Sequence, residues 1–287
     1  PFPLTSRTRL PVAIQTGCDN LCSFCITRIA RGRHANIPAE QIIRQILEAE
    51  EAGIREIVLT GINLAAWGAE DSNKAEQARL HELLERVLRE TEMPRIRLSS
   101  LGPQYIHDGF FDAFSDSRLC AYLHLSLQSG SDSVLERMMR GHGTEEAKRI
   151  AERARVVRTD VALAADIIAG FPEETDTEHR ETLAFIEQTG FAKLHVFPYS
   201  VRQGTPAAEM TQVKGNLHKQ RASEIRDVGR RLRRDFVKSQ LGQVSKVLVE
   251  TKESGLTGNY IRLQVPNGIE GTIREIQVTE ESLAERL

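Results

Sequence analysis

Two hydrophobic periodicities alternate along the chain between residues 12 and 197. Short apolar runs predict buried strands, and longer segments with apolar residues every three or four positions predict amphipathic helices. The strands are expected at 12–14, 57–59, 96–99, 122–127, 161–168 and 193–197, and the helices at 38–53, 80–90, 105–114, 132–140, 144–158 and 177–188. Strands that alternate with helices indicate repeated βα units and a parallel sheet. We therefore expect an α/β fold, a six-stranded, partly open (β/α)6 barrel.

The pattern changes after residue 215. Residues 216–241 predict one long helix, which carries eight Lys or Arg against three acids between Lys219 and Lys238. Beyond Gly242, alternating runs at 244–250, 260–265 and 271–278 are separated by glycine and Asn-Gly turns, which indicates a small all-β domain. The predicted division is a linker remnant at 1–10, a core domain at 11–215, a basic connecting helix at 216–241 and the β domain at 242–287.

Composition narrows the class of protein. Hydrophobic residues at 40% and charged residues at 27% are typical of globular proteins, and we expect no membrane partner because no apolar run approaches the roughly 18 residues of a span. The net charge of −2 gives no overall signal for nucleic acid, so only a local basic patch could bind it. Unpaired thiols without a secretory leader favour the cytoplasm. Because the chain starts with Pro1, we expect an upstream part to have been removed, although a processed natural terminus would look the same.

Three of the four cysteines lie in one loop after the first predicted strand. Cys18, Cys22 and Cys25 have C-x3-C-x2-C spacing, which can wrap three thiolates around one metal cluster. Iron–sulfur clusters and structural zinc normally take four protein ligands. Three close cysteines without a local fourth therefore favour a cluster that takes its last ligand from a substrate.

Other interpretations of the three cysteines are weaker. Zinc could recruit His34 as a fourth ligand, but its distance from Cys25 fits no finger-like spacing. Structural thiols are not expected in a polar loop, and three thiols cannot all pair as disulfides.

With Phe24 before the last cysteine, this motif resembles that of the radical S-adenosylmethionine (SAM) superfamily. The resemblance implies a [4Fe-4S] cluster ligated by Cys18, Cys22 and Cys25, with SAM chelating the fourth iron. It also implies reductive cleavage of SAM to a 5′-deoxyadenosyl radical, with an electron donor such as flavodoxin or ferredoxin.

Polar and glycine-rich motifs follow the predicted strands, at the edge where parallel sheets bind ligands. Gln128 and Ser129 would contact the cofactor while Asp132 caps the next helix. Asp166 in an apolar strand needs a ligand or an Arg partner, whereas His195 is expected to be a core histidine and Cys120 structural. Arg153 and Arg155 could bind the SAM carboxylate or simply occupy an exposed helix face. The residues expected around SAM are Phe24, Gly61, Asn63, Ser99, Gln128, Ser129, Arg153, Asp166 and Pro172.

Together the motifs resemble those of the methylthiotransferases. They are Ala30-Arg31-Gly32, the turn 59–63, Leu98-Ser99-Ser100-Leu101-Gly102-Pro103, the loop 127–132, the segment 166–172 and His195-Val196-Phe197-Pro198-Tyr199-Ser200. The last motif, followed by Gly204-Thr205-Pro206-Ala207, is most similar to enzymes that add a methylthio group to N6-threonylcarbamoyladenosine in tRNA. The final β domain resembles the family's RNA-binding TRAM domain.

The chain departs from this family in three places. The family's N-terminal domain, which binds a second [4Fe-4S] cluster through three further cysteines, is absent from this sequence. The usual Arg-Ser-Arg is replaced by His34-Ala35-Asn36, and Glu173 follows Pro172 where the family usually has glycine. As given, the chain is expected to bind and cleave SAM without completing sulfur insertion.

The resemblance implies tRNA as partner, docked by phosphate contacts to the basic helix and the TRAM-like domain of a monomer. The helix could equally be a solvated face with pairs such as Asp227–Arg231. Alternative substrates are isopentenyladenosine in tRNA and an aspartate of a ribosomal protein. An alternative of another class is a non-catalytic RNA-binding protein with a structural metal.

Overall fold

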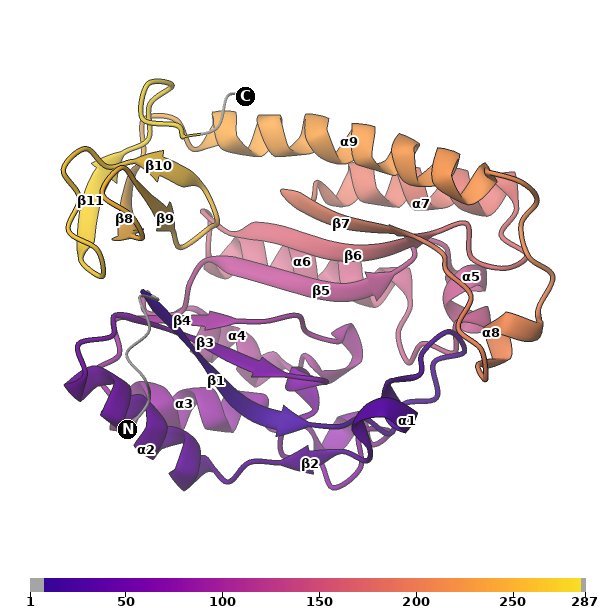
Figure 1. Cartoon of the computed structure of the whole chain (residues 1–287), viewed down its shortest axis with the longest axis horizontal. Helices are drawn as coiled ribbons and strands as arrows, with labels where there is room; N and C mark the ends of the chain where they lie inside the picture. The colour runs from indigo at the N-terminus through magenta and orange to yellow at the C-terminus, as the bar shows by residue number, and fades with distance from the viewer. Residues whose placement is uncertain (1–7, 285–287) are drawn as a thin grey trace.

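The computed structural model describes residues 8–284 (Figure 1). Its centre is an arc of six parallel strands that follow one another in chain order. They are β1 (Arg9–Thr16), β3 (Glu56–Gly61), β4 (Arg95–Leu98), β5 (Tyr122–Gln128), β6 (Ala162–Ala169) and β7 (Lys193–Pro198). Strands β1, β3 and β4 pair in one sheet and β5, β6 and β7 in another, and single bridges such as Leu101–Leu125 join the two. Within residues 8–284, β1 and β7 do not pair with each other, so the arc is open between them. The six predicted parallel strands are confirmed.

Amphipathic helices cover the outside of this arc, as predicted (Figure 1). They are α2 (Ala39–Glu51), α3 (Leu80–Glu90), α4 (Asp108–Phe114), α5 (Asp132–Arg137), α6 (Thr144–Val157) and α7 (Asp176–Thr189). One apolar cluster runs from the strands into these helices and includes Ile42, Leu83, Phe111 and Ile150. The helix predicted at 105–114 begins only at Asp108, because Pro103–Tyr105 forms a separate 3-10 turn, η3.

Five short elements were not predicted, because each is too short to show a hydrophobic period. They are α1 (Thr27–Arg31), β2 (Ala35–Asn36), η1 (Leu64–Ala66), η2 (Ala75–Gln77) and α8 (Pro206–Glu209). Most of them lie in the loops beyond the carboxyl ends of the strands, where they shape the candidate site.

The C-terminal part consists of a long helix and a small antiparallel sheet. Helix α9 (Leu217–Ser239) packs along β7 and α7, and no helix of the described residues is long and apolar enough to cross a membrane (Figure 1). The sheet has the order β10-β9-β8-β11, with β8 (Val244–Val249), β9 (Ser254–Thr257), β10 (Arg262–Gln264) and β11 (Ile273–Gln277).

Strand β9 is absent from the predicted set because Gly255 looks like a turn residue in the sequence. In the structure Gly255 lies inside the strand, where a Cβ atom would be 2.5 Å from the Leu248 carbonyl oxygen and from Val247 Cγ1. Glycine is therefore required there for close packing rather than for a turn.

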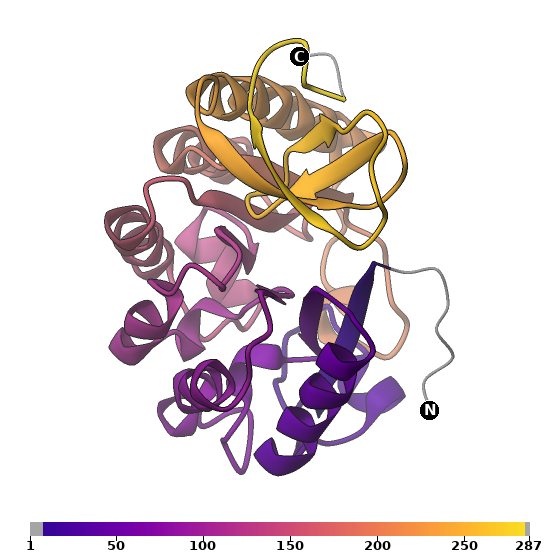
Figure 2. The same ribbon diagram turned by 90° about the vertical axis from the view of Figure 1, so that its left-hand side faces the viewer.

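The β domain lies at the amino-terminal ends of the barrel strands (Figure 2), opposite the end that carries the cysteine loop and α1 (Figure 1). Two buried arginines of β4 connect the two parts: Arg95 Nη1 donates to the Lys246 carbonyl at 2.8 Å, and Arg97 Nη1 to the Gly258 carbonyl at 2.9 Å. Both guanidinium groups also donate to the buried carboxylate of Glu56. These polar contacts fix the β domain at the floor of the barrel.

Candidate cofactor site

The cysteine loop leaves β1 through a glycine that no other residue could replace without rearrangement. Gly17 has a φ of +66°, and a Cβ atom there would lie 1.8 Å from the carbonyl oxygen of Arg33. Next to it, Cys18 N donates to the Gly32 carbonyl at 3.2 Å, which closes the base of the loop. The loop is thereby held against the start of the segment that follows α1.

Ser23, between two of the cysteines, anchors the loop to the rest of the barrel. Its backbone N–H donates to the Met138 carbonyl at 3.0 Å, and its hydroxyl to the Arg137 carbonyl at 2.8 Å. The N–H of Ala207, in α8, donates to the Ser23 carbonyl at 2.8 Å. Ser23 was not predicted to be a site residue, because only its position inside the cysteine motif distinguishes it from other serines.

Each of the three thiols has a hydrogen-bond donor beside it. The Ser72 hydroxyl lies 3.9 Å from Cys18 Sγ, Arg140 Nη1 lies 3.2 Å from Cys22 Sγ, and the Thr27 N–H lies 3.4 Å from Cys25 Sγ. Burial raises the pKa of the Cys18 thiol, and the negative charge of the other two thiolates raises it further. Thiols with donors aimed at sulfur fit a cluster ligand set, because donors of this kind stabilise cluster-bound thiolates.

The structure gives no support to the zinc alternative. Both ring nitrogens of His34 are engaged, Nδ1 with the Gln15 side chain at 2.9 Å and Nε2 with the Ala69 carbonyl at 3.1 Å. Across residues 8–284, no three His, Cys, Asp or Glu side chains converge closely enough for a single metal ion. A four-iron cluster stands between its ligands, so its thiols can be farther apart than those around one zinc ion.

The turn after β3 is tied to the cysteine loop by one tyrosine. The Tyr105 hydroxyl is within 3.0 Å of the side chains of Asn20 and Asn63, and it donates to the Ser72 carbonyl at 2.6 Å. The Asn63 N–H donates to Gln15 Oε1 at 2.8 Å, so this predicted SAM contact is held rigidly at the strand end. Gly61 lies just before it, where a Cβ atom would be 3.0 Å from that same Gln15 oxygen.

The other predicted contacts at the strand ends differ in their surroundings. Gln128 has the left-handed φ of +81°, whereas Ser129 is buried with its hydroxyl 3.2 Å from that of Thr182. The hydroxyl of Ser99 is buried and has no hydrogen-bond partner among the described residues. A buried hydroxyl without a partner is costly unless a ligand satisfies it, so Ser99 fits a role in binding the cofactor.

Asp166, for which a ligand or an arginine partner was expected, is paired with a histidine. His124 Nε2 is 2.9 Å from Asp166 Oδ1, and the His124 and His195 rings stack with their centroids 4.9 Å apart. All three are only partly buried, so His195 is not the enclosed core histidine that was expected. Burial and the neighbouring His124 and Lys193 lower the pKa of His195, which favours its neutral form.

The remaining predicted SAM contacts include aromatic and basic residues. Phe24 lies edge-on to Phe171, with ring centroids 6.5 Å apart, and Pro172, the next residue in the sequence, is buried. Arg153 is not brought to the site: it pairs with Asp108 on the outer helices, and its guanidinium lies 4.5 Å above the Phe111 ring. Arg155 likewise donates to the Thr189 and Gly190 carbonyls. Both arginines therefore lie on the outer side of α6, which was the alternative to binding the SAM carboxylate.

Glu173, the departure next to Pro172, also has a structural consequence. Its φ of +63° lies in the left-handed region that glycine adopts without strain, and its N–H donates to the Thr211 carbonyl at 3.0 Å. The loop thus keeps a backbone suited to glycine although a glutamate occupies it.

Comparison with known proteins agrees with this geometry. The profile of the radical SAM superfamily matches residues 12–186, and the chain belongs to this superfamily. It is 36% identical to threonylcarbamoyladenosine tRNA methylthiotransferase MtaB of Rickettsia prowazekii, over 90% of this chain and 61% of that protein. It is 37% identical to the tRNA-2-methylthio-N(6)-dimethylallyladenosine synthase of Agrobacterium fabrum, over 83% of this chain and 53% of that protein. The chain thus spans little more than half the length of these relatives, and the predicted resemblance is confirmed.

Solved structures share the fold at low sequence identity. Coproporphyrinogen III oxidase (HemN) from Escherichia coli aligns with a TM-score of 0.56 at 15% identity, over 91% of this chain and 67% of that chain. The methyltransferase TsrM from Kitasatospora setae, solved with a [4Fe-4S] cluster and cobalamin, aligns at 0.55 and 16% over 69% of this chain and 38% of that one. The superfamily match supports the predicted cofactors, a [4Fe-4S] cluster and SAM, and the solved structures show that the fold is shared.

Proposed function

We propose that the chain is the catalytic and tRNA-binding part of a methylthiotransferase that modifies C2 of N6-threonylcarbamoyladenosine in tRNA. The observation that carries this proposal is the triad of free thiols, each with its own donor, at the carboxyl end of a parallel barrel. Cys18, Cys22 and Cys25 would hold the cluster, which together with SAM supplies a carbon-centred radical able to activate an aromatic C–H bond.

The chain's own residues would place SAM and substrate at this end of the barrel. The Asn63 N–H donates to Gln15, Gly61 pairs with Gln15 between β1 and β3, and the buried Ser99 hydroxyl has no hydrogen-bond partner among the described residues. Deeper along the strands, His124 and Asp166 form a hydrogen-bonded pair that is only partly buried. Such a pair can exchange hydrogen bonds with a purine, so these two residues would orient the substrate base.

The choice among substrates rests on similarity. Relatives named for threonylcarbamoyladenosine and for dimethylallyladenosine match at nearly equal identity, 36% and 37%. The match to the first covers more of this chain, 90% against 83%. This wider coverage favours threonylcarbamoyladenosine over dimethylallyladenosine or a ribosomal-protein aspartate.

The same proposal includes a second cluster, the localisation and oligomeric state of the protein, its electron donor and the role of its C-terminal sheet. A second [4Fe-4S] cluster is expected in the part of the relatives' length that this chain does not span. We also propose a cytoplasmic monomer reduced by a flavodoxin or ferredoxin, whose C-terminal sheet (β8 to β11) acts as a TRAM domain. The alternative of another class is a non-catalytic RNA-binding protein with a structural metal; among residues 8–284 no three His, Cys, Asp or Glu side chains converge on a site for a single metal ion.

The test starts with anaerobic reconstitution of the chain with iron and sulfide, followed by dithionite and SAM. Four irons per chain and cluster-dependent 5′-deoxyadenosine are expected, and Cys22→Ala should abolish both. A protein extended to the relatives' full length would then be incubated with tRNA, and the nucleosides identified by mass spectrometry. Zinc in place of iron, or equal product from Cys22→Ala, would refute the proposal.

A further inference from the structure

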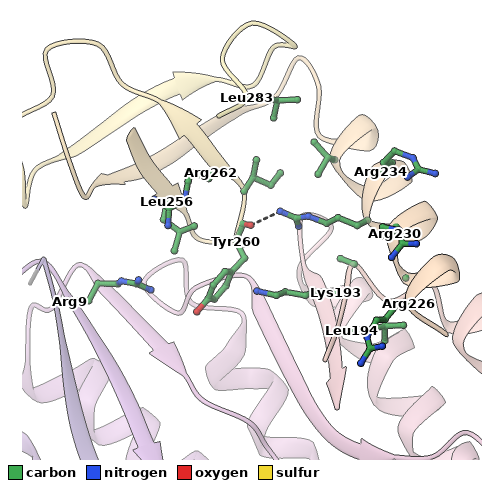
Figure 3. Close-up of a pocket in the computed structure, with 15 residues that line it drawn as sticks. Arg9, Lys193, Leu194, Arg226, Arg230, Arg234, Leu256, Tyr260, Arg262 and Leu283 are labelled. Carbon is green, nitrogen blue, oxygen red and sulfur yellow. Dashed lines mark hydrogen bonds between the residues drawn. The ribbon is translucent and has the colours of Figure 1, made fainter. Parts of the chain in front are cut away.

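A basic groove lies at the end of the barrel opposite the cysteine loop, between α9, the start of β7 and the β domain (Figure 3). It has a volume of about 550 Å³, and among residues 8–284 none of the residues that line it is acidic. Seven of its lining residues are basic: Arg9, Lys193, Arg226, Arg230, Arg233, Arg234 and Arg262. Because the whole chain has a net charge of −2, this concentration of positive charge is local.

Three of these arginines form a row along one face of α9. Arg226, Arg230 and Arg234 are spaced four residues apart, so they succeed one another at roughly 6 Å intervals along the helix. Figure 3 shows their side chains one after another along the helix, and all three line the groove. All three are exposed, and Arg234 makes no hydrogen bond or ion pair with another residue between 8 and 284.

Several hydrogen bonds and ion pairs hold the walls of the groove in place. Glu250 is shared by Arg9 and Arg262, at 2.8 Å from each, so one carboxylate serves two guanidinium groups. Arg233 Nη2 donates to the Tyr260 carbonyl at 2.7 Å, which ties α9 to the β domain. Arg230 pairs with Asp227 and Arg226 donates to the Val196 carbonyl, and both remain exposed to solvent.

A glycine in α9 packs closely against β7 at the wall of the groove. Gly229 lies against Leu194 of β7, where a Cβ atom would be 3.1 Å from Leu194 Cδ1. A glycine inside a helix usually has such a packing reason. Its effect is to bring the row of arginines close to β7, beside the open side of the barrel between β7 and β1.

We propose that this groove binds the phosphate backbone of the RNA substrate and guides a strand toward the open side of the barrel. A row of evenly spaced cations fits a chain of phosphates better than one small anion, and contacts of this kind position a nucleic acid without reading its sequence. The identity of the RNA as tRNA rests on the proposed function. The groove itself rests only on its geometry and charge.

The test is the salt dependence of binding of fluorescein-labelled tRNA to the 287-residue chain, measured by fluorescence anisotropy. Changing Arg226, Arg230 and Arg234 together to Gln should reduce the slope of log K against log salt by about 2–3, and Arg234→Gln alone by about 1. A matched control replaces three exposed basic residues of the outer helices, Arg44, Arg89 and Lys148, by Gln and should leave the slope unchanged. Thermal unfolding by circular dichroism verifies that each variant folds.

The outcomes separate this proposal from the proposed function, because the binding assay needs no cluster. A chain that fails to cleave SAM but loses tRNA binding with the groove variants would refute the function and retain the groove. Equal slopes for the groove and control variants would overturn the groove. Phosphatidylserine vesicles or polyglutamate that bind as tightly as tRNA at the same salt would overturn its assignment to RNA.

Discussion

Arg97 Nε donates a 2.8 Å hydrogen bond to Glu56 Oε1 at the floor of the barrel, where both side chains are almost completely buried. Burial opposes the charged form of Glu56, but Arg97 and Arg95 outweigh it and lower the pKa of the carboxyl group. The remaining donors of Arg97 reach the Thr257 and Gly258 carbonyls of the β domain. One carboxylate therefore orients the arginines that attach the β domain to the barrel.

Replacing this carboxylate should weaken both the barrel and the attachment of the β domain. Glu56→Gln leaves two buried guanidinium groups without a compensating charge, and loss of one partner of a buried pair costs roughly 3–5 kcal/mol. Urea unfolding followed by fluorescence should show this loss, whereas the exposed Glu51→Gln should change the free energy of unfolding by less than about 0.5 kcal/mol. Equal stability of the two variants would contradict the role assigned to Glu56.

Much of the barrel could be predicted because its periodicities are local. Apolar runs and amphipathic stretches recur within windows of about ten residues, and burial of both sheet faces makes the strands continuous in hydrophobicity. The floor of the barrel could not be predicted in the same way. Arg95 and Arg97 look like interruptions of a short strand, and the carbonyl groups that satisfy them lie about 150 residues further along the chain.

The candidate site could likewise be predicted only in part. The cysteine spacing is a local signal, and the strand-end motifs place Gly61 and Gln128 at one edge of the fold. Arg153 was misplaced because a basic residue on a helix gives no indication of which partner it will face. His124 was missed although a signal existed: polar residues alternate with leucines through β5, so the polar side chains share the face that lines the barrel.

Two glycines of the cysteine loop offer a matched test of why the loop has its shape. Gly17 and Gly32 both have positive φ, +66° and +75°, but only at Gly17 would a Cβ atom collide with backbone. Gly17→Ala should therefore reduce iron bound after reconstitution to near zero, because the loop must move. Gly32→Ala carries only the strain of the left-handed conformation, about 1–2 kcal/mol, and should retain its iron. Similar iron contents in the two variants would show that the contact at Gly17 is dispensable.

The ion pair between Arg137 and Glu178 should make the stability of the chain depend on acid pH. Burial alone would raise the pKa of Glu178, but hydrogen bonds from Arg137, Ser133 and Thr175 lower it to about 2. Because the unfolded pKa is about 4.3, this stabilisation is complete above that pH and is lost as the pH falls toward 2.

The comparison uses the cluster-free chain and Glu178→Gln, with unfolding followed at several pH values. The variant should be less stable by at most ~3 kcal/mol near neutral pH, and the difference should shrink below about pH 4. Arg137 also accepts the Ser23 hydroxyl through its carbonyl, so the variant should bind iron less tightly after reconstitution. A stability difference that does not vary with pH would refute the assignment to this carboxyl group.

Arg140 should set the reduction potential of the cluster. Its Nη1 donates to Cys22 Sγ at 3.2 Å while its Nη2 is held by the Ser126 carbonyl at 2.6 Å. Hydrogen bonds and positive charge at a ligand sulfur make a cluster easier to reduce. Arg140→Gln removes the charge and should shift the potential to more negative values, on the order of tens of millivolts. Arg140→Lys keeps the charge and should shift it less, as measured by redox titration followed by electron paramagnetic resonance. A potential that is unchanged in Arg140→Gln would mean that this guanidinium group does not act on the cluster.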